Sequence, residues 1–289
     1  MDNPMAPPTG RATRVLVTGG TGTLGRLVVP RLRDAGCAVR VLSRHPREAE
    51  AGIELVTGDL ATGEGIDAAV AGAETIVHCA GSGKGDEEKA RTLVRAASRA
   101  GARHLVYISV VGADRVPVGG ALDRAMFGYF ASKLGAERAV AASGLPWTTL
   151  RATQFYDLFL MVAQQMAKLP VLPVPSGFRF QPVDTADVAA RLAELALSEP
   201  AGLVPDVAGP RIYGMADLLR GYLRATHRHR PMVPLWLPGK AARAVRAGAI
   251  LAPDRAVGRR TWEEFLADWV SASSAGDSRR RTGDLARAG

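Results

Sequence analysis

A glycine-rich turn between an apolar run and an amphipathic run constrains this chain more than any other feature. Residues 18–25 read Thr-Gly-Gly-Thr-Gly-Thr-Leu-Gly and follow the apolar residues 15–17. Gly19 permits a tight turn, Gly22 lets the backbone approach a ligand, and Gly25 lets the next helix pack against the strand. Unpaired N–H groups at the start of that helix attract anions. This order of strand, turn and helix predicts a bound dinucleotide, and a purely structural turn is the alternative.

Short apolar runs alternate with helical periodicities through the first half of the chain. The expected strands are residues 15–18, 39–43, 55–57, 75–79, 104–109 and 147–151, and the expected helices between them are 24–35, 64–72, 87–100 and 130–143. Apolar strands separated by helices predict an α/β fold, a doubly wound parallel sheet of the Rossmann type.

The regular alternation of strand and helix patterns ends after the sixth expected strand. Helices are expected near 155–168 and 184–197, with a proline-rich segment between them, and shorter elements are expected to continue to residues 262–270. We expect residues 13–152 to form the dinucleotide-binding core and residues 153–271 to form a small substrate lobe and returning elements of the same domain. Residues 272–289 contain almost nothing apolar and are expected to be a disordered tail.

The composition excludes several classes of protein. Hydrophobic residues make up 47% of the 289, enough for a sizeable core. Cys37 and Cys79 lie in apolar runs, which favours buried reduced thiols over a disulfide or a metal site. No apolar run reaches the roughly 18 residues of a membrane span, and the first residues lack the core of a signal peptide. We expect a cytoplasmic protein with no membrane span and no metal.

The net charge of +9 is concentrated in one stretch. Residues 220–260 contain ten arginines and lysines and one aspartate, which equals the net charge of the whole chain. A solvated arginine-rich face is the interpretation we favour, and a surface for a partner is the alternative. No stacking aromatic residues are interleaved with these charges, so nucleic acid is not expected as a partner.

The end of the second expected strand decides between the two nicotinamide cofactors. A carboxylate there would accept a hydrogen bond from the ribose 2′-hydroxyl of NAD, whereas a 2′-phosphate needs a cation. The chain reads Ser43-Arg44-His45-Pro46 and has no carboxylate at this point. Arg44 can bind the 2′-phosphate with two hydrogen bonds, and Ser43 can add a donor. The sequence therefore predicts NADP, in its reduced form NADPH.

The glycine spacing resembles that of the short-chain dehydrogenase/reductase superfamily. Residues 129–137, 142–157, 182–189 and 261–266 are similar to the NmrA-like atypical members, and the resemblance extends from about residue 14 to 270. It implies that Asp59 and Leu60 approach the adenine, although Asp59 could equally be a helix N-cap. It also implies that Ala80 and Gly81 lie beneath the ribose and nicotinamide. His78, within an apolar run, is read as a core histidine.

The turn residues themselves complete the expected cofactor site. Thr21, Thr23 and Leu24 are interleaved with Gly22 and Gly25. We expect their backbone N–H groups to share the contact with the pyrophosphate.

Tyr129 and Lys133 are the main candidates for chemistry. They stand four residues apart, so on a helix they share one face. A phenol has an unperturbed pKa of about 10, and we expect the neighbouring ammonium and the positive nicotinamide together to bring the pKa of Tyr129 toward the working range. Ser109, at the end of the fifth expected strand, resembles the serine that orients a substrate carbonyl in this superfamily. The apolar residues 116–127 are expected to be either a lid that excludes water or a hydrophobic loop.

Two functions are compatible with these motifs. The first is an NADPH-dependent oxidoreductase that transfers hydride to a small apolar carbonyl or quinone-like acceptor, with Tyr129 and Lys133 as proton relay. Residues 116–127, 154–159 and 171–180 would supply an apolar pocket. The second is a non-catalytic redox sensor that binds NADP(H) and acts on a protein partner through residues 220–260. The sequence specifies neither the substrate nor the oligomeric state.

Overall fold

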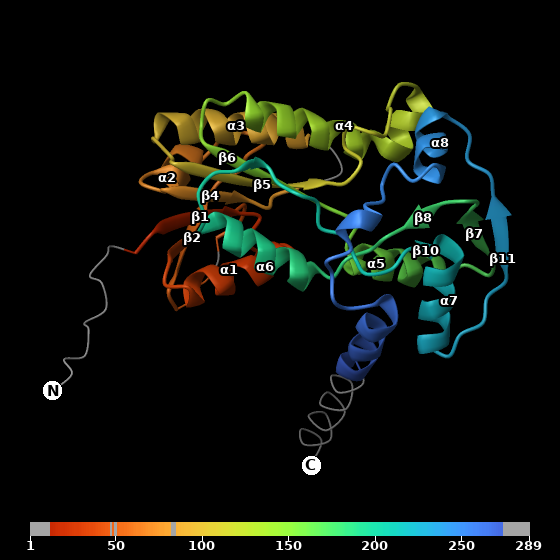
Figure 1. The fold of residues 1–289 in the computed structure, drawn as a ribbon. Helices are drawn as coiled ribbons and strands as arrows, with labels where there is room; N and C mark the ends of the chain where they lie inside the picture. The colour runs from red at the N-terminus through yellow and green to blue at the C-terminus, as the bar shows by residue number, and fades with distance from the viewer. Residues whose placement is uncertain (1–11, 47, 49–50, 82–84, 274–289) are drawn as a thin grey trace, which may run out of the picture.

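The structure, a computed structural model, describes residues 12–46, 48, 51–81 and 85–273 (Figure 1). Within these residues the central sheet has seven parallel strands in the order β3-β2-β1-β4-β5-β6-β9. The strands are β1 Arg14–Thr18, β2 Ala38–Ser43, β3 Ile53–Thr57, β4 Thr75–His78, β5 His104–Val110, β6 Trp147–Ala152 and β9 Gly202–Leu203. The strand order reverses between β1 and β4, so the predicted doubly wound fold is confirmed.

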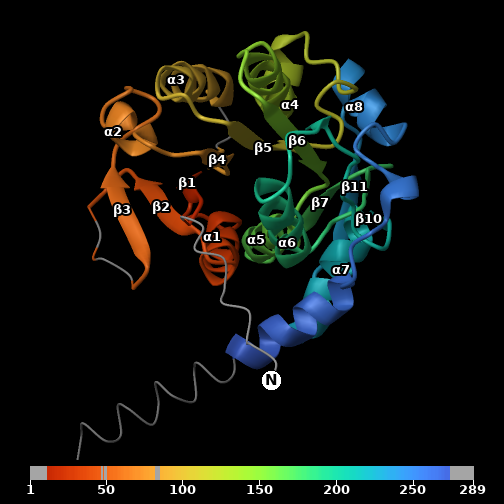
Figure 2. The same cartoon turned by 60° about the vertical axis from the view of Figure 1, so that its left-hand side comes forward.

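Helices cover both faces of this sheet (Figures 1 and 2). One face carries α1 Gly25–Asp34 and α6 Thr185–Ala196, and the other carries α2 Ile66–Val70, α3 Asp86–Arg99 and α4 Ala121–Ala141. Successive side chains of a strand enter opposite layers: Val15 and Val17 pack with α1 and α6, and Leu16 packs with α2 and α3. The strands are therefore buried on both sides, which explains their nearly continuous apolar sequences.

A smaller lobe lies at one end of the sheet (Figure 1). It consists of α5 Tyr156–Met166, α7 Met215–Ala225, α8 Lys240–Arg246, the strand pair β7 Leu172–Pro175 and β11 Met232–Leu235, and the strand pair β8 Arg179–Phe180 and β10 Tyr213–Gly214. Trp262 is fully buried in its core, stacks on Phe265, and donates a hydrogen bond from Nε1 to the carbonyl of Leu218. Between α5 and α7 the chain returns to the sheet to form α6 and β9.

Helix α4 begins earlier than the sequence predicted. We expected a lid or loop over residues 116–127 and a helix from 130, but α4 starts at Ala121. Phe127 and Phe130 are buried in a cluster with Phe178 and residues of α8. This packing stabilises two further turns of helix after the pair Gly119-Gly120, so the loop prediction is wrong for its second half.

The described part of the chain ends in a helix. The last described helix covers residues 262–273, so residues 272–273 of the expected tail are helical. The rest of that tail, residues 274–289, and the first eleven residues lie outside the described part of the chain. No described helix is both long and apolar enough to cross a bilayer.

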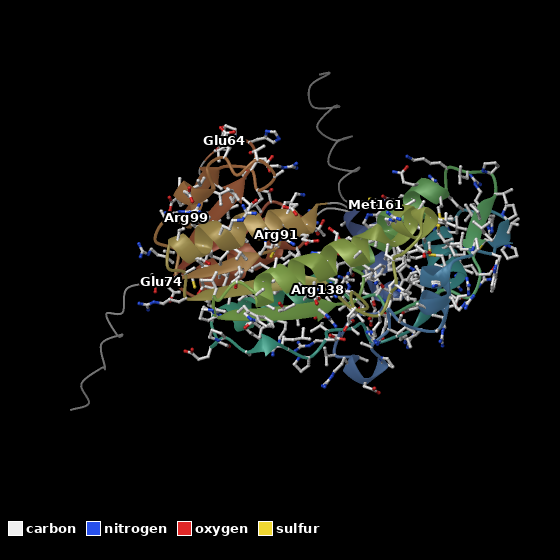
Figure 3. All side chains as sticks on the ribbon, turned by 90° about the horizontal axis from the view of Figure 1, so that it is seen from above. Glu64, Glu74, Arg91, Arg99, Arg138 and Met161 are labelled. Carbon is white, nitrogen blue, oxygen red and sulfur yellow. The ribbon has the colours of Figure 1, made fainter. Side chains whose placement is uncertain are left out.

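Basic side chains lie on two parts of the surface. In the expected basic stretch Arg220 is exposed and pairs with Asp217, and six further exposed arginines form no ion pair with a described residue: Arg224, Arg228, Arg230, Arg243, Arg255 and Arg259. Figure 3 shows α3 and α4 side by side from above, with Arg91 and Arg99 on α3 and Arg138 on α4. These exposed arginines fit the interpretation of a solvated face.

A buried ion pair attaches α4 to the sheet. The guanidinium of Arg151 on β6 donates two hydrogen bonds to the Glu137 carboxylate on α4, at 2.8 and 2.7 Å, and a third to Asp114 at 2.9 Å. The hydrogen bonds to Glu137 foremost raise the pKa of Arg151 above its ordinary value, against the effect of burial. This pair holds α4, and with it Tyr129 and Lys133, against β6.

We expect Glu137→Gln to lower the free energy of unfolding by about 3 kcal/mol, because it leaves a buried guanidinium without its carboxylate. Urea denaturation measures the change. The control is Arg220→Gln, which removes an exposed pair with Asp217 worth about 0–1 kcal/mol. Equal losses in the two variants would show that the Arg151 pair has no special role in stability.

Candidate active site

The glycine turn between β1 and α1 is tightly packed at both ends and open in the middle. Gly19 has a φ of +69°, and a Cβ there would lie 2.6 Å from the backbone nitrogen of Ala80. A Cβ on Gly25 would lie 2.2 Å from the carbonyl oxygen of Gly19, whereas one on Gly22 would meet only that oxygen, at 3.2 Å. The outer glycines are thus required by the turn and its packing, and Gly22 leaves an exposed surface.

Backbone donors are available at this surface. The helical hydrogen bonds of α1 begin with the N–H of Arg26, which donates to Gly22. The N–H groups of Thr23, Leu24 and Gly25 have no acceptor among the described residues. The Leu24 side chain is buried in the core, so this residue offers only its backbone. Free N–H groups, the positive end of a helix and an open glycine fit a pyrophosphate.

Arg44 and Ser43, the two residues at the end of β2 that are expected at the 2′-phosphate, differ in exposure and in hydrogen bonding. Arg44 is exposed and forms no ion pair with any described residue. Ser43 is buried, and its hydroxyl donates to the carbonyl of His45 at 2.8 Å. The guanidinium of Arg44 is therefore available to an anion, whereas the Ser43 hydroxyl holds its own loop.

Asp59 and Leu60 follow β3. The Asp59 carboxylate accepts a hydrogen bond from the N–H of Ala61 at 2.8 Å, and Leu60 is buried under α2. Helix α2 begins at Ile66 with Gly65 as its N-cap. Asp59 thus stabilises a turn rather than capping that helix, and its contact with adenine stays a prediction.

Ala80 and Gly81, which follow β4, lie next to the glycine turn and next to Lys133 respectively. Ala80 lies against Gly19, and a Cβ on Gly81 would lie 3.3 Å from the Lys133 ammonium and 3.4 Å from the Asp86 carboxylate. The turn and the lysine of α4 therefore lie along one edge of the sheet, at the carboxyl ends of β1 and β4.

Tyr129 and Lys133 lie together, as their spacing predicted. The Lys133 side chain is only 3% exposed, and its ammonium lies 5.9 Å from the centre of the Tyr129 ring, which is 37% exposed. Lys133 donates to the carbonyl of Ile108 at 3.1 Å and lies 3.4 Å from the Asp86 carboxylate. It also lies 5.0 Å from the ring of Tyr107. This ammonium is held from three sides.

The protein groups around Tyr129 do not lower its pKa, and the contribution expected from a positive nicotinamide stays a prediction. Partial burial of the phenol foremost, and then the negative charge of Asp86, raise the pKa of Tyr129 above its ordinary value. Burial lowers the pKa of Lys133, and Asp86 opposes that effect. The sequence interpretation counted the ammonium but not the carboxylate beside it. The phenol of Tyr129 is accordingly neutral near pH 7 and can donate a proton.

Ser109 and His78 both lie at the ends of central strands. Ser109 is buried on the face of β5 that α4 covers, and its hydroxyl has no hydrogen-bond partner in the described part of the chain. His78 stacks on Tyr107, and its Nδ1 lies 2.6 Å from the Thr18 hydroxyl. Burial foremost lowers the pKa of His78 to about 3. His78 is therefore a neutral core residue, as expected, and the role of Ser109 stays a prediction.

The sequence interpretation missed Asp86. It begins α3 in the series Asp86-Glu87-Glu88, which is typical of solvated charges at the positive end of a helix. Glu88 fits that description with a side chain 74% exposed, but Asp86 is 1% exposed. The available signal was indirect: a lysine on a buried face needs a partner of opposite charge.

The segments expected to form an apolar pocket divide into two groups. Val116, Phe127 and Phe178 pack in one core cluster of the lobe, and Phe159 packs in another. The exposed apolar side chains of these segments include Leu122, Met126 and Leu158. Most of the aromatic side chains expected to line the pocket therefore build the lobe itself.

A family model described as NAD(P)H-binding matches residues 19–199, which is more than half of the chain. The chain belongs to this NAD(P)H-binding family. The glycine turn, the end of β2 and the Tyr129–Lys133 pair all lie within the match. The match confirms the expected nicotinamide cofactor, and it agrees with the resemblance to NmrA-like short-chain dehydrogenases/reductases.

Individual proteins agree with this assignment. The chain is 33% identical over 208 residues to a ceramide reductase of Caulobacter vibrioides, an alignment that covers 66% of this chain and 63% of that protein. It is 32% identical over 202 residues to a (4-alkanoyl-5-oxo-2,5-dihydrofuran-3-yl)methyl phosphate reductase of Streptomyces griseus, with 68% of each covered. Both of these relatives are reductases, which agrees with the expectation of an oxidoreductase. The chain spans less than two thirds of the length of the ceramide reductase.

The fold is also that of a solved enzyme. An NADPH-dependent quinone oxidoreductase of Escherichia coli, crystallised with NADPH, superposes with a TM-score of 0.74 at 21% identity. The superposition covers 88% of this chain and 99% of that one.

We expect Gly22→Ala to weaken NADPH binding at least about tenfold, because a methyl group would separate the ligand from the backbone donors. The melting temperature should change little, since Gly22 has no left-handed φ. Isothermal titration and thermal unfolding measure the two effects.

Gly119→Ala is the matched control, because its Cβ would enter open space. If Gly22→Ala bound NADPH as tightly as this control, the pyrophosphate would not lie over Gly22.

Proposed function

We propose that this protein is an NADPH-dependent oxidoreductase that transfers hydride to a small apolar carbonyl or quinone-like acceptor. The observation that carries the proposal is the position of Lys133 beside Gly81, on the same sheet edge as the open glycine turn, with the Tyr129 ring 5.9 Å from the Lys133 ammonium. The reductases among its relatives support the reaction class.

In this proposal Lys133 holds the cofactor, Tyr129 donates a proton and Ser109 orients the acceptor. The bound nicotinamide would supply the hydride. An ammonium has three N–H donors, and Lys133 directs one to Ile108 and faces Asp86 with another. In the proposal its third donor holds a ribose hydroxyl. Tyr129 donates the proton to the acceptor oxygen. The Ser109 hydroxyl, which has no hydrogen-bond partner among the described residues, orients that oxygen.

The surface beside Tyr129 supports an apolar acceptor. Leu122 and Met126 are both exposed on α4, and with Tyr129 they follow the i, i+4, i+7 spacing of one helix face. On α5, Leu158 and Met161 are exposed as well. An aromatic or aliphatic carbonyl gains more from such a surface than a sugar, whose hydroxyls would lack partners.

We expect Tyr129→Phe to reduce kcat at least about a hundredfold, because general acid catalysis contributes about that much. NADPH affinity should stay close to that of the wild type, since the phenol is placed at the acceptor. Steady-state rates with quinones and aryl carbonyls, together with titration of NADPH, measure both quantities. Undiminished turnover would remove Tyr129 from the reaction.

The preference for NADPH rests on Arg44 and the absence of a carboxylate at the end of β2. We expect Arg44→Ala to weaken NADPH binding by about 10- to 150-fold, the value of a charge-assisted hydrogen bond, and to leave NADH binding unchanged. Arg224→Ala, another exposed arginine without an ion pair to a described residue, is the control. Equal NADPH affinity in both variants would place the 2′-phosphate elsewhere or exclude NADPH as the preferred cofactor.

The alternative is a sensor that binds NADP(H) without turnover. The exposed arginines of residues 220–260, on α7, α8 and the segments around them, are the observation that favours it. A protein that binds NADPH tightly, reduces no acceptor and retains a partner only in one redox state would support this alternative. Measurable reductase activity of the isolated protein would count against it.

A further inference from the structure

A buried carboxylate faces the proposed catalytic lysine. Asp86 at the start of α3 and Lys133 on α4 are 1% and 3% exposed, and their charged groups lie 3.4 Å apart. The backbone N–H of Asp86 donates to the Ser132 hydroxyl at 3.0 Å, which ties α3 to the residue beside Lys133. The carboxylate is thus held in place by its helix as well as by the ammonium.

The ion pair with Asp86 changes the effect of the Lys133 ammonium on the ionisation of Tyr129. An ammonium without a partner, buried beside a phenol, would favour the phenolate. A carboxylate on the same ammonium makes the pair neutral overall, and its own charge repels a phenolate. The negative charge of Asp86, which lies against Lys133, therefore accounts for part of the rise in the pKa of Tyr129.

Other titratable groups also surround the pair. They are Lys89 on α3, Glu137 on α4, Tyr107 on β5, and His78 and Cys79 at the end of β4. Burial lowers the pKa of His78 to about 3 and raises that of Cys79 to about 12, so both are neutral near pH 7. Glu137 is bound by Arg151. Asp86 is the carboxylate in direct contact with Lys133.

We propose that Asp86 is a positioning residue that keeps Tyr129 a neutral phenol, and that it thereby extends the pH range of reduction upward. The catalytic part of this inference rests on the proposed function, whereas the effect of Asp86 on the ionisation of Tyr129 does not.

The chemistry explains why the pH range is affected. In reduction, a hydride adds to the acceptor carbon and the π electron pair of the C=O bond moves to oxygen. The O–H bond of Tyr129 breaks, its proton forms the new alcohol, and solvent returns a proton to the tyrosinate. The resting enzyme must therefore carry a phenol. Oxidation of an alcohol needs a resting tyrosinate, which Asp86 disfavours, so we expect it only at higher pH.

The ionisation of Tyr129 can be measured without cofactor or substrate. The absorbance of tyrosinate is followed against pH in each protein, and the same titration of its Tyr129→Phe counterpart is subtracted. We expect Asp86→Asn to lower the titration midpoint of Tyr129 by at least about one pH unit. Glu88→Gln, which removes an exposed carboxylate from the same helix turn, should leave it unchanged. An unchanged midpoint in folded Asp86→Asn overturns the proposal.

Asp86→Glu separates a charge effect from a structural one. It keeps the carboxylate, so we expect a midpoint close to that of the wild type. A midpoint as low as that of Asp86→Asn would show that the shape of the pair matters and not its charge, and would overturn the proposal. All variants are measured in sucrose, which favours the compact state, and thermal unfolding verifies that they fold. If Asp86→Asn does not fold, Asp86→Ser takes its place, with the same expected fall in the midpoint and the same contrary result.

The pH profile of turnover tests the catalytic part. In Asp86→Asn, the alkaline limb of the reduction rate should move to lower pH by the same amount as the Tyr129 midpoint. A midpoint that moves while the limb stays would overturn the catalytic part. If the protein reduces no acceptor, the proposed function is wrong. The absorbance titration still tests the effect of Asp86 on the ionisation of Tyr129.

Discussion

The close approach of the β1–α1 turn to the end of β4 is the constraint on which the rest of the site depends. Gly19 lies so near the backbone of Ala80 that no side chain fits between them, and Gly25 brings α1 against the same turn. The two strands at the reversal of the sheet order therefore end together. That contact gives a ligand over the glycine turn a continuous path along Ala80 and Gly81 to α4.

Helix α4 is the second component of the site, and charge rather than apolar packing sets its position at two points. Glu137 binds Arg151 of the sheet, and Lys133 binds Asp86 of the neighbouring helix. Each pair is buried, so each charge is tolerated only because its partner is near. The first pair fixes where the helix lies. The second determines the electrostatic surroundings of Tyr129.

The sequence predicted the parts of the molecule that depend on local patterns. The central strands are apolar runs because helices cover both sheet faces, and the glycine turn is visible because its residues are adjacent. The start of α4 was missed because its first turns are stabilised by Phe178 and α8, far along the chain. The small sheets of the lobe pair residue 172 with residue 232 and left no periodic signal. The effect of Asp86 on the pKa of Tyr129 was not predicted because Asp86 lies 43 positions before Tyr129 in the sequence and is recognisable only by its burial.

The path of the chain has a consequence for how this protein folds during synthesis. Helix α6 covers one face of the sheet and β9 extends its edge, yet both are made after α5 and the first strands of the lobe. A nascent chain that ends at β6 exposes the apolar side chains that α6 later covers. The Rossmann core therefore becomes complete only once residue 203 has left the ribosome, so it depends on contacts that are distant in sequence.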